Sequence, residues 1–191
     1  VDPSPHRVSD GVCPTGVGSL CQGVRNSSCF CLLGGRGSGK STVVKMLTGE
    51  LPIATGEVYV CGVNLRRNLY KAIRLLGYCP QGDAFHGLLT GLETLHMYAR
   101  IKGVAEKEIP GVVNAVSLLL RMKPHVGYLT KTYNVDAKRK LAVAVAAIGR
   151  PKVMVLDEPT FAMSQPGRRV VWDYLSALKE SGTTLLVATS R

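Results

Sequence analysis

Residues 34–42, which read GGRGSGKST, combine glycines, a lysine and a serine at a spacing that could bind phosphate. The segment fits the pattern G-x-x-x-x-G-K-[ST], and the apolar run over 29–33 precedes it as a buried strand would. Glycine lets the backbone turn through angles that a Cβ forbids, so that successive N–H groups can point at one polyphosphate. The sequence therefore predicts an anion-binding loop between a strand and a helix.

The predicted helix runs from Lys40 to about Thr48, and Gly49 should end it. Its positive N-terminal end would face the same anion, while Lys40 would reach the β- and γ-phosphates and Ser41 would ligate Mg²⁺. A glycine-rich turn that binds nothing is the alternative, and the combination of strand, spacing, lysine and serine argues against it. The predicted nucleotide-binding residues are Gly34, Gly35, Arg36, Gly37, Ser38, Gly39, Lys40, Ser41 and Thr42.

Two adjacent carboxylates, Asp157 and Glu158, follow the apolar run 153–156, which we expect to be a strand. In a protein with a phosphate-binding loop, we expect Asp157 to hold Mg²⁺ and Glu158 to polarise the attacking water. A solvated acidic pair in a turn is the alternative. The four apolar residues before the pair and Pro159 after it favour a function.

Strands that alternate with helices predict a mostly parallel sheet, with its ligand at the carboxyl ends of the strands. The strand over 76–79 should stop at Pro80 and present Gln81 at its tip, although Gln81 taken alone is an ordinary polar turn residue. The other expected elements are a short antiparallel strand over 58–62, helices from 88 to about 147 with the third beginning near Ala137, an amphipathic helix over 167–180 and a buried strand over 184–188.

Composition limits the class of protein. The chain has 191 residues, of which 46% are hydrophobic and 19% charged, as in a globular domain, and no apolar run is long enough for a membrane helix. Its net charge of +11 suggests an acidic partner such as nucleotide phosphates, anionic lipid or nucleic acid. Because the cations are scattered, the charge favours an ordinary solvated basic surface over such a partner. The six cysteines lack paired C-x-x-C spacing, so we expect buried structural thiols. Because the chain begins with Val1, we expect a segment of a longer protein.

Together these motifs resemble the nucleotide-binding domain of an ABC transporter. The resemblance rests on the loop 34–42, Gln81 after a strand, the helical stretch, the KRKL run at 138–141 and LDEPT at 156–160, and it covers about 19–191. Stretches such as KMLTGE, GYCPQGDAF, LLTGLETL and KRKLAVAVAAIGRP are similar to the A subfamily, whose members move lipids, and more to its second domain than to its first.

This resemblance implies an α/β P-loop NTPase fold: a mostly parallel sheet with flanking helices, an antiparallel strand element and a helical subdomain. The ATPase core would comprise 1–82 and 149–191, and the helical subdomain 83–148. The expected partners are a second nucleotide-binding domain in a head-to-tail dimer, transmembrane domains and, indirectly, a lipid substrate. The domain would then lie at the cytoplasmic face of a membrane.

The resemblance also implies how the candidate residues would act with the cofactors ATP and Mg²⁺. Lys40 would act on the transferred phosphoryl group, and Glu158 would orient the water. Mg²⁺ would be held by Ser41, Gln81 and Asp157, with Gln81 also sensing the membrane domains. The catalytic set is therefore Glu158, Lys40 and Gln81, and the metal set is Ser41, Gln81 and Asp157.

The signature motif of the family, a Ser-Gly-Gly run that caps the γ-phosphate held by the partner domain, reads Asn134-Val135-Asp136 in this chain. Both glycines are replaced by residues with a Cβ, which blocks close approach of backbone amides. Asp136 adds a negative charge, and each like-charge pair costs roughly 3 kcal/mol at ~5 Å and an effective dielectric of ~20. We therefore predict a poor signature half-site, with Asn134 replacing the serine only in part.

Three further positions depart from the family pattern. Ser164 stands where an aspartate couples the two ATP sites, Arg191 stands where a switch histidine is expected, and 1–28 contain no Phe, Tyr or Trp to stack on adenine. Our leading hypothesis is an ATPase domain of a lipid transporter, with activity lowered by these departures. A nucleotide-binding regulatory module that does not hydrolyse ATP is the alternative. An ABC ATPase that works on nucleic acid is a third, favoured only by the basic charge.

Overall fold

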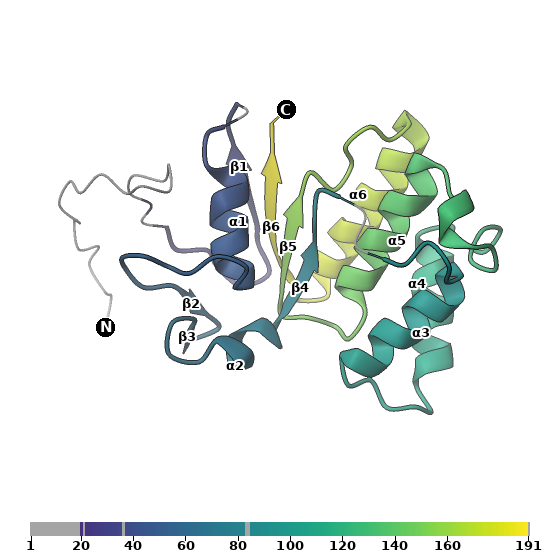
Figure 1. Ribbon diagram of the computed structural model, residues 1–191, viewed down its shortest axis with the longest axis horizontal. Coiled ribbons are helices and arrows are strands. Elements are labelled where there is room, and N and C mark those ends of the chain that lie inside the picture. Colours follow the sequence, from purple (N-terminus) through teal and green to yellow (C-terminus); the bar gives the residue numbers. More distant parts are fainter. Residues whose placement is uncertain (1–19, 21, 36, 83–84, 191) are drawn as a thin grey trace.

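The computed structural model describes residues 20, 22–35, 37–82 and 85–190, and a parallel sheet forms its centre (Figure 1). The four strands lie in the order β1-β6-β5-β4, and every neighbouring pair is parallel. Since the strands are parallel, the segments that follow them meet at one edge of the sheet. The strands are β1 (Cys29–Leu33), β4 (Leu76–Cys79), β5 (Val153–Asp157) and β6 (Thr184–Thr189).

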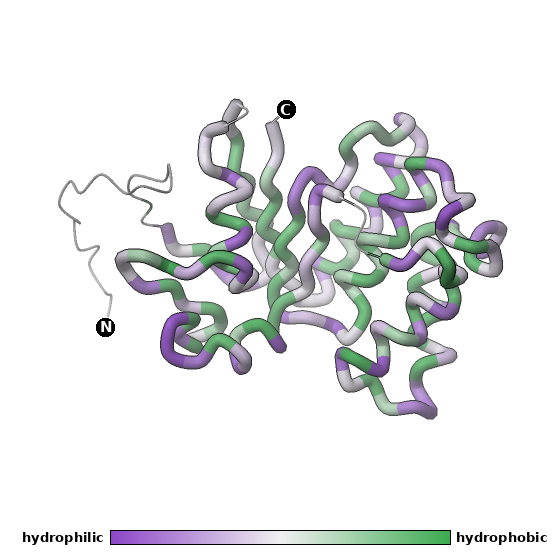
Figure 2. Tube along the Cα trace, in the orientation of Figure 1, coloured by the Kyte–Doolittle hydropathy of each residue, from purple (hydrophilic) through white to green (hydrophobic). Residues whose placement is uncertain are grey.

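Helices cover both faces of this sheet, as the alternating pattern predicts. On one face, α1 (Lys40–Thr48) packs Val44 into a core that also contains Val155 of β5 and Ala188 of β6. On the other face, α5 (Val135–Ala147) and α6 (Gln165–Glu180) pack against the alternate side chains of β5 and β6. The hydrophobic stretches in Figure 2 follow the strands and these inner helix faces.

The helical stretch between β4 and β5 contains α3 (Gly91–Ile101), α4 (Ile109–Leu119), the 3₁₀ turn η1 (Thr130–Thr132) and α5. Thr90 and Glu93 form a capping box that starts α3, with the Glu93 N–H 3.1 Å from the Thr90 hydroxyl. Helix α5 and the residues after it pack closely on β4 at Gly77. A Cβ at this position would lie only 2.8 Å from Pro151 Cγ and 3.0 Å from the Ala146 carbonyl carbon, so only glycine fits. This close contact fixes α5 relative to the sheet.

A small hairpin provides the antiparallel element that the sequence predicts. Strands β2 (Tyr59–Val60) and β3 (Val63–Asn64) pair antiparallel, and the two residues between them, Cys61 and Gly62, have φ of 48° and 78°. Two consecutive left-handed residues give the tight turn that suits a two-residue hairpin loop. The short helix α2 (Leu69–Ile73) then leads to β4.

Some sequence-based expectations are wrong in detail. Strand β1 is not buried: it stands at the edge of the described sheet, and Leu33 is 70% exposed. Exposed thiols at Cys29, Cys31 and Cys61 contradict the expectation of buried cysteines, which holds for Cys79, while Cys13 and Cys21 lie outside the described residues.

The helix limits also shift by a few residues. Helix α5 begins at Val135 rather than near Ala137, because the Asn134 side chain accepts a hydrogen bond from the Ala137 N–H at 2.9 Å and thereby caps the helix. Helix α6 begins at Gln165 for the same reason, with Ser164 as its cap. No helix in the described part of the chain has the length and hydrophobicity of a membrane span.

Candidate functional site

The loop after β1 is closed by the side chain of Lys40. Its ammonium donates hydrogen bonds to the carbonyl oxygens of Gly34 and Gly35, at 2.6 and 2.8 Å, and to the Ser38 hydroxyl at 3.3 Å. Gly39, which precedes α1, has a φ of 85° and Gly37 has a φ of 79°, a left-handed region that glycine enters without strain. The lysine charge therefore lies inside the turn, while Arg36 is outside the described residues.

The first turn of α1 contributes to the same positive end. The helix has nine residues, no acidic residue in its first turn and no side-chain cap at Gly39. Its first N–H groups have no partner within the helix, and the helix dipole makes this end attractive to anions. Lys40, Ser41 and Thr42 all belong to this turn. The geometry and charge of the predicted loop therefore suit an anionic group.

Asp157 lies at the last position of β5, 5% exposed, and accepts a hydrogen bond from the Ser41 hydroxyl. Burial raises the pKa of Asp157, and the repulsion from Glu158 adds to this, while the Ser41 hydrogen bond and the Lys40 charge oppose it. A hydroxyl and a carboxylate in contact are hard oxygen ligands of the kind that Mg²⁺ takes, together with phosphate oxygens. The chemistry of these donors therefore fits a magnesium ion.

Glu158 is held against the end of β6. Its carboxylate accepts hydrogen bonds from the Ser190 N–H at 2.6 Å and the Thr189 hydroxyl at 3.1 Å. Burial acts to raise the pKa of Glu158, but the hydrogen bonds from Ser190 and Thr189 outweigh it and the pKa is lowered. The φ of Glu158 is 48°, a strained conformation that costs roughly 1–3 kcal/mol and is typical of functional sites. The carboxylate is therefore ionised and fixed beside the loop.

Gln81 joins the other site residues through its main chain. Its carbonyl oxygen lies 2.9 Å from a guanidinium nitrogen of Arg139, and the same guanidinium donates to the Asp157 and Glu158 carbonyl oxygens at 3.3 and 2.9 Å. The structure thus brings Lys40, Ser41, Asp157 and Glu158 into one site and ties Gln81 to it.

Arg139 is the residue that sequence reasoning missed, because it stands in a basic run on a helix, where a solvated side chain is the usual expectation. It is only 4% exposed. The signal was present: Arg139 is spaced at i, i+3, i+4 and i+7 with Ala142, Val143 and Ala146, the buried face of α5.

Two departures from the family pattern contact each other. The Asp136 carboxylate accepts hydrogen bonds from the Ser164 N–H, at 2.8 Å, and from the Ser164 hydroxyl. That hydroxyl in turn accepts from the Gly167 N–H at 3.2 Å, and a Cβ on Gly167 would lie 2.7 Å from Asp136 Cγ. The charge of Asp136 is therefore bound within its own chain. Arg191, the third departure, lies outside the described residues.

Comparison with solved structures shows the fold. The protein is similar to a dimeric bacterial ABC transporter cassette, MJ0796, with a TM-score of 0.84, 20% identity and coverage of 92% of this chain and 80% of that one. It is also similar to the ATP-binding subunit of an ABC transporter, with a TM-score of 0.82, 19% identity and coverage of 92% and 73%.

Comparison of sequences gives the family. The family described as "ABC transporter" matches residues 20–161. The phospholipid-transporting ATPase ABCA3 of Rattus norvegicus is 40% identical over 173 residues, 91% of this chain and 10% of that protein. The retinal-specific phospholipid-transporting ATPase ABCA4 of Homo sapiens is 38% identical over 183 residues, which cover 96% of this chain and 8% of that protein.

The chain therefore belongs to the ABC transporter family, as an ATP-binding domain of its ATPase class, similar to those of the A subfamily. The predicted fold class, a P-loop NTPase with a mostly parallel sheet, is confirmed. The chain spans a tenth or less of the length of the two relatives named above.

The opposite pKa shifts of the two carboxylates predict opposite effects on stability. Because the pKa of Asp157 is raised in the folded state, its ionisation destabilises the fold as the pH rises through that pKa. Asp157→Asn should therefore unfold at a higher urea concentration than the parent at about pH 7, without nucleotide or Mg²⁺, and the gain should shrink toward about pH 4. Glu158→Gln, where the pKa is lowered, should destabilise at neutral pH. If both substitutions changed the free energy of unfolding in the same direction at neutral pH, the opposite pKa shifts of the two carboxylates would be contradicted.

The contact between Asp136 and Ser164 predicts energetic coupling. Urea unfolding of Asp136→Ala, Ser164→Ala and the double variant should give a coupling free energy of about 0.5–3 kcal/mol, because each substitution removes the partner of the other. The control cycle combines Asp136→Ala with Thr90→Ala, which removes the N-cap of α3. That pair should be additive to within about 0.5 kcal/mol. Additivity of both pairs would refute the contact.

Proposed function

We propose that this domain binds Mg-ATP at the loop 34–42 and hydrolyses it. The observation that carries the proposal is the contact between Ser41 and Asp157 at the mouth of the loop that Lys40 closes, because it unites a phosphate site with a metal site. Mg²⁺ would be held by Ser41, Asp157 and Gln81 and would offset charge on the phosphates. Glu158, ionised and fixed by β6, would orient the water and accept its proton.

The loop residues would divide the work of binding. The N–H groups of 34–42 and the first turn of α1 would hold the phosphate oxygens, and Lys40 would exchange its bonds to the Gly34 and Gly35 carbonyls for bonds to phosphate. An ammonium that already sits inside the loop needs little movement to do so. The binding site is therefore largely formed before nucleotide arrives.

A second nucleotide-binding domain is the proposed partner, in a head-to-tail dimer. The similar cassette MJ0796 is described as dimeric, which supports this arrangement. In such a dimer the segment 134–136 would face the phosphates held by the partner, and in this chain Asn134 caps α5 while Asp136 is bound to Ser164. We propose that the site containing Lys40 works and that the opposite site is weak.

A nucleotide-binding module that does not hydrolyse ATP is the second candidate. The observation that favours it is the Asp136–Ser164 contact, which involves both the signature position and the coupling position.

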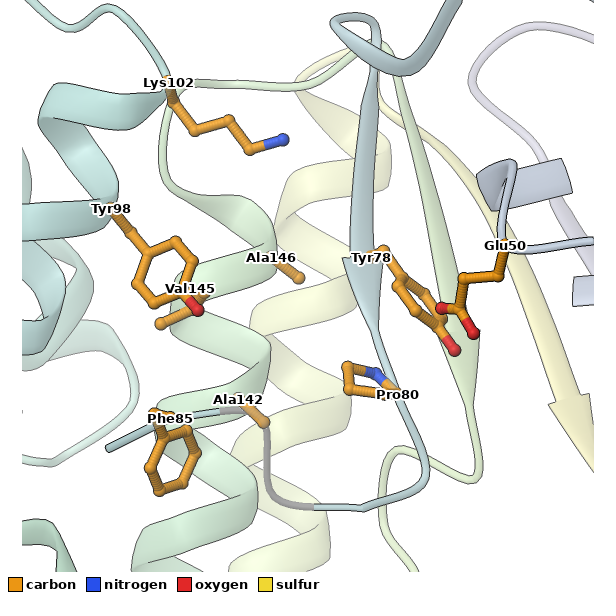
Figure 3. Close-up of a pocket in the computed structure, with 9 residues that line it drawn as sticks. All are labelled: Glu50, Tyr78, Pro80, Phe85, Tyr98, Lys102, Ala142, Val145 and Ala146. Carbon is orange, nitrogen blue, oxygen red and sulfur yellow. The ribbon is translucent and has the colours of Figure 1, made fainter. Parts of the chain in front are cut away.

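The membrane-domain partner would occupy a groove of about 410 Å³ beside the site (Figure 3). Figure 3 shows it between α3 and β4, with Val145 of α5 among the lining residues and Glu50 and Lys102 on opposite sides. Pro80 also lines it and directly precedes Gln81, so that an occupant would touch the segment that holds the metal residue. The apolar lining fits an amphipathic segment with charged ends.

We further propose that the domain lies at the cytoplasmic face of a membrane and drives lipid movement there, since the relatives are phospholipid-transporting ATPases. Residues 83–148 would act as a helical subdomain that transmits motion, and 1–82 with 149–191 as the ATPase core. In this arrangement α5 connects the two, because it lies on β4.

Substitutions at Lys40 and Glu158 test the proposed chemistry. Lys40→Ala should abolish ATP binding, because the positive charge within the loop is lost, as measured by fluorescence titration with an ATP analogue. Glu158→Gln should keep binding and stop phosphate release, measured with the second nucleotide-binding domain present. Equal ATP affinity in Lys40→Ala and the parent would refute the phosphate site. Phosphate release no faster in the parent than in Glu158→Gln would favour the non-hydrolysing module.

A charge placed in the groove tests the membrane partner. Val145→Glu, in the complete transporter in lipid vesicles, should leave ATP affinity unchanged and reduce lipid transport, because the carboxylate would be buried by the docked segment. Leu119→Glu, on the exposed side of α4, is the matched control and should transport normally. Normal transport by Val145→Glu would rule out the groove as the docking surface.

A further inference from the structure

The buried guanidinium of Arg139 has a partner for each of its donors. Its Nε donates to the Pro159 carbonyl at 3.3 Å, one terminal nitrogen donates to the Pro80 and Gln81 carbonyls at 3.0 and 2.9 Å, and the other donates to the Asp157 and Glu158 carbonyls at 3.3 and 2.9 Å. An arginine has five N–H donors, and five main-chain carbonyl oxygens receive them.

These carbonyls belong to two chain segments that continue the neighbouring parallel strands β4 and β5 at the carboxyl edge of the sheet. Pro80 and Gln81 follow β4, whereas Asp157 ends β5 and Glu158 and Pro159 follow it. The guanidinium therefore joins the backbone that bears Gln81 to the backbone that bears Asp157 and Glu158. The planar fork of arginine suits this task, since a lysine has only three donors around one point.

Burial of a cation is costly because the charge loses its hydration. All five hydrogen bonds from the guanidinium to oxygen go to neutral carbonyls, and the Asp157 carboxylate interacts with it only through its charge. A role in the fold alone would be served as well by an apolar side chain on this face of α5, next to Leu141, Ala142 and Val143. The presence of a charge at 4% exposure therefore points to a role in positioning these carbonyls.

Helix α5 is hydrogen-bonded to the segment after β5 at a second point. Asp136, one turn before Arg139, binds the Ser164 N–H and hydroxyl at the far end of the segment that starts with Glu158. The segment 158–164 is thus held at its start by the arginine and at its end by the aspartate. Glu158, whose φ of 48° is strained, is the first residue of this segment.

We propose that Arg139 is a positioning residue for the metal site: it sets the spacing between Gln81 and Asp157 and so determines how tightly Mg²⁺ binds beside the nucleotide. The proposal rests on the proposed function, because it requires that the domain binds Mg-ATP. Arg139 would act through the main chain of Gln81 and Asp157, whose side chains would hold the metal.

The test compares Arg139→Met and Arg139→Lys with the parent. ATP affinity is measured in the purified chain with EDTA and with Mg²⁺, and the gain that Mg²⁺ gives is the readout. Arg139→Met should lose about 10- to 100-fold of this gain, as is typical when a residue that supports metal ligands is removed. Arg139→Lys should lose less. Affinity without Mg²⁺ should be unchanged, because Lys40 and α1 form the phosphate loop separately.

Hydrogen–deuterium exchange without any ligand gives a second readout. Exchange should rise in 79–82 and 158–164 of Arg139→Met, where the Phe161 N–H donates to the Glu158 carbonyl, and stay as in the parent in 34–48. Lys140→Met is the control, since it removes a positive charge from the next position of α5. If Arg139→Met does not unfold cooperatively in urea, Arg139→Lys alone is decisive.

Each other outcome overturns part of the assignment. Unchanged exchange in both segments would show that Arg139 does not hold them. If exchange rises but the gain in ATP affinity from Mg²⁺ is unchanged, Arg139 has a purely structural role. An equal loss of ATP affinity with and without Mg²⁺ would lead to the same conclusion. A parent chain that gains nothing from Mg²⁺ would refute the proposed metal site itself, and with it the positioning role.

Discussion

The parallel alignment of four strands is the constraint on which the site depends. Leu33 pairs with Thr189, Asp157 with Ala188 and Cys79 with Leu156, so the strand ends lie level to within a few residues. Each connection must then leave the sheet at the same edge. The loop after β1, the carboxylates at the end of β5 and the glutamine after β4 meet there because of this register, although they are far apart in sequence.

Positive and negative groups lie next to each other at this edge of the sheet. The ammonium of Lys40 and the N-terminal end of α1 are positive, and the carboxylates of Asp157 and Glu158 lie near that ammonium. Burial raises the pKa of Asp157 and so makes its negative charge costly without a cation, whereas hydrogen bonds lower the pKa of Glu158. Asp157 therefore gains more from a nearby cation, whereas Glu158 stays ionised through its hydrogen bonds.

Helix α5 links this edge to the part of the domain that would face a partner. Its side chains at 136 and 139 hold both ends of the segment after β5, and its Ala146 backbone lies close against β4. Asp136 stands in place of a glycine of the signature motif, and its carboxylate accepts hydrogen bonds from Ser164. The two departures are therefore joined by hydrogen bonds within the chain.

The sequence alone determined the local elements, because helix caps, glycine turns and apolar runs act over a few residues. It predicted α1 with Gly49 at its end, β4, β5 and β6, the antiparallel element, the phosphate loop and the two carboxylates. Tertiary structure decided the burial of Arg139, the contact between Asp136 and Ser164 and the exposure of β1. These depend on which elements become neighbours, and a charged side chain looks solvated until the carbonyls that surround it, 18 to 59 residues away in the chain, are brought together by the fold.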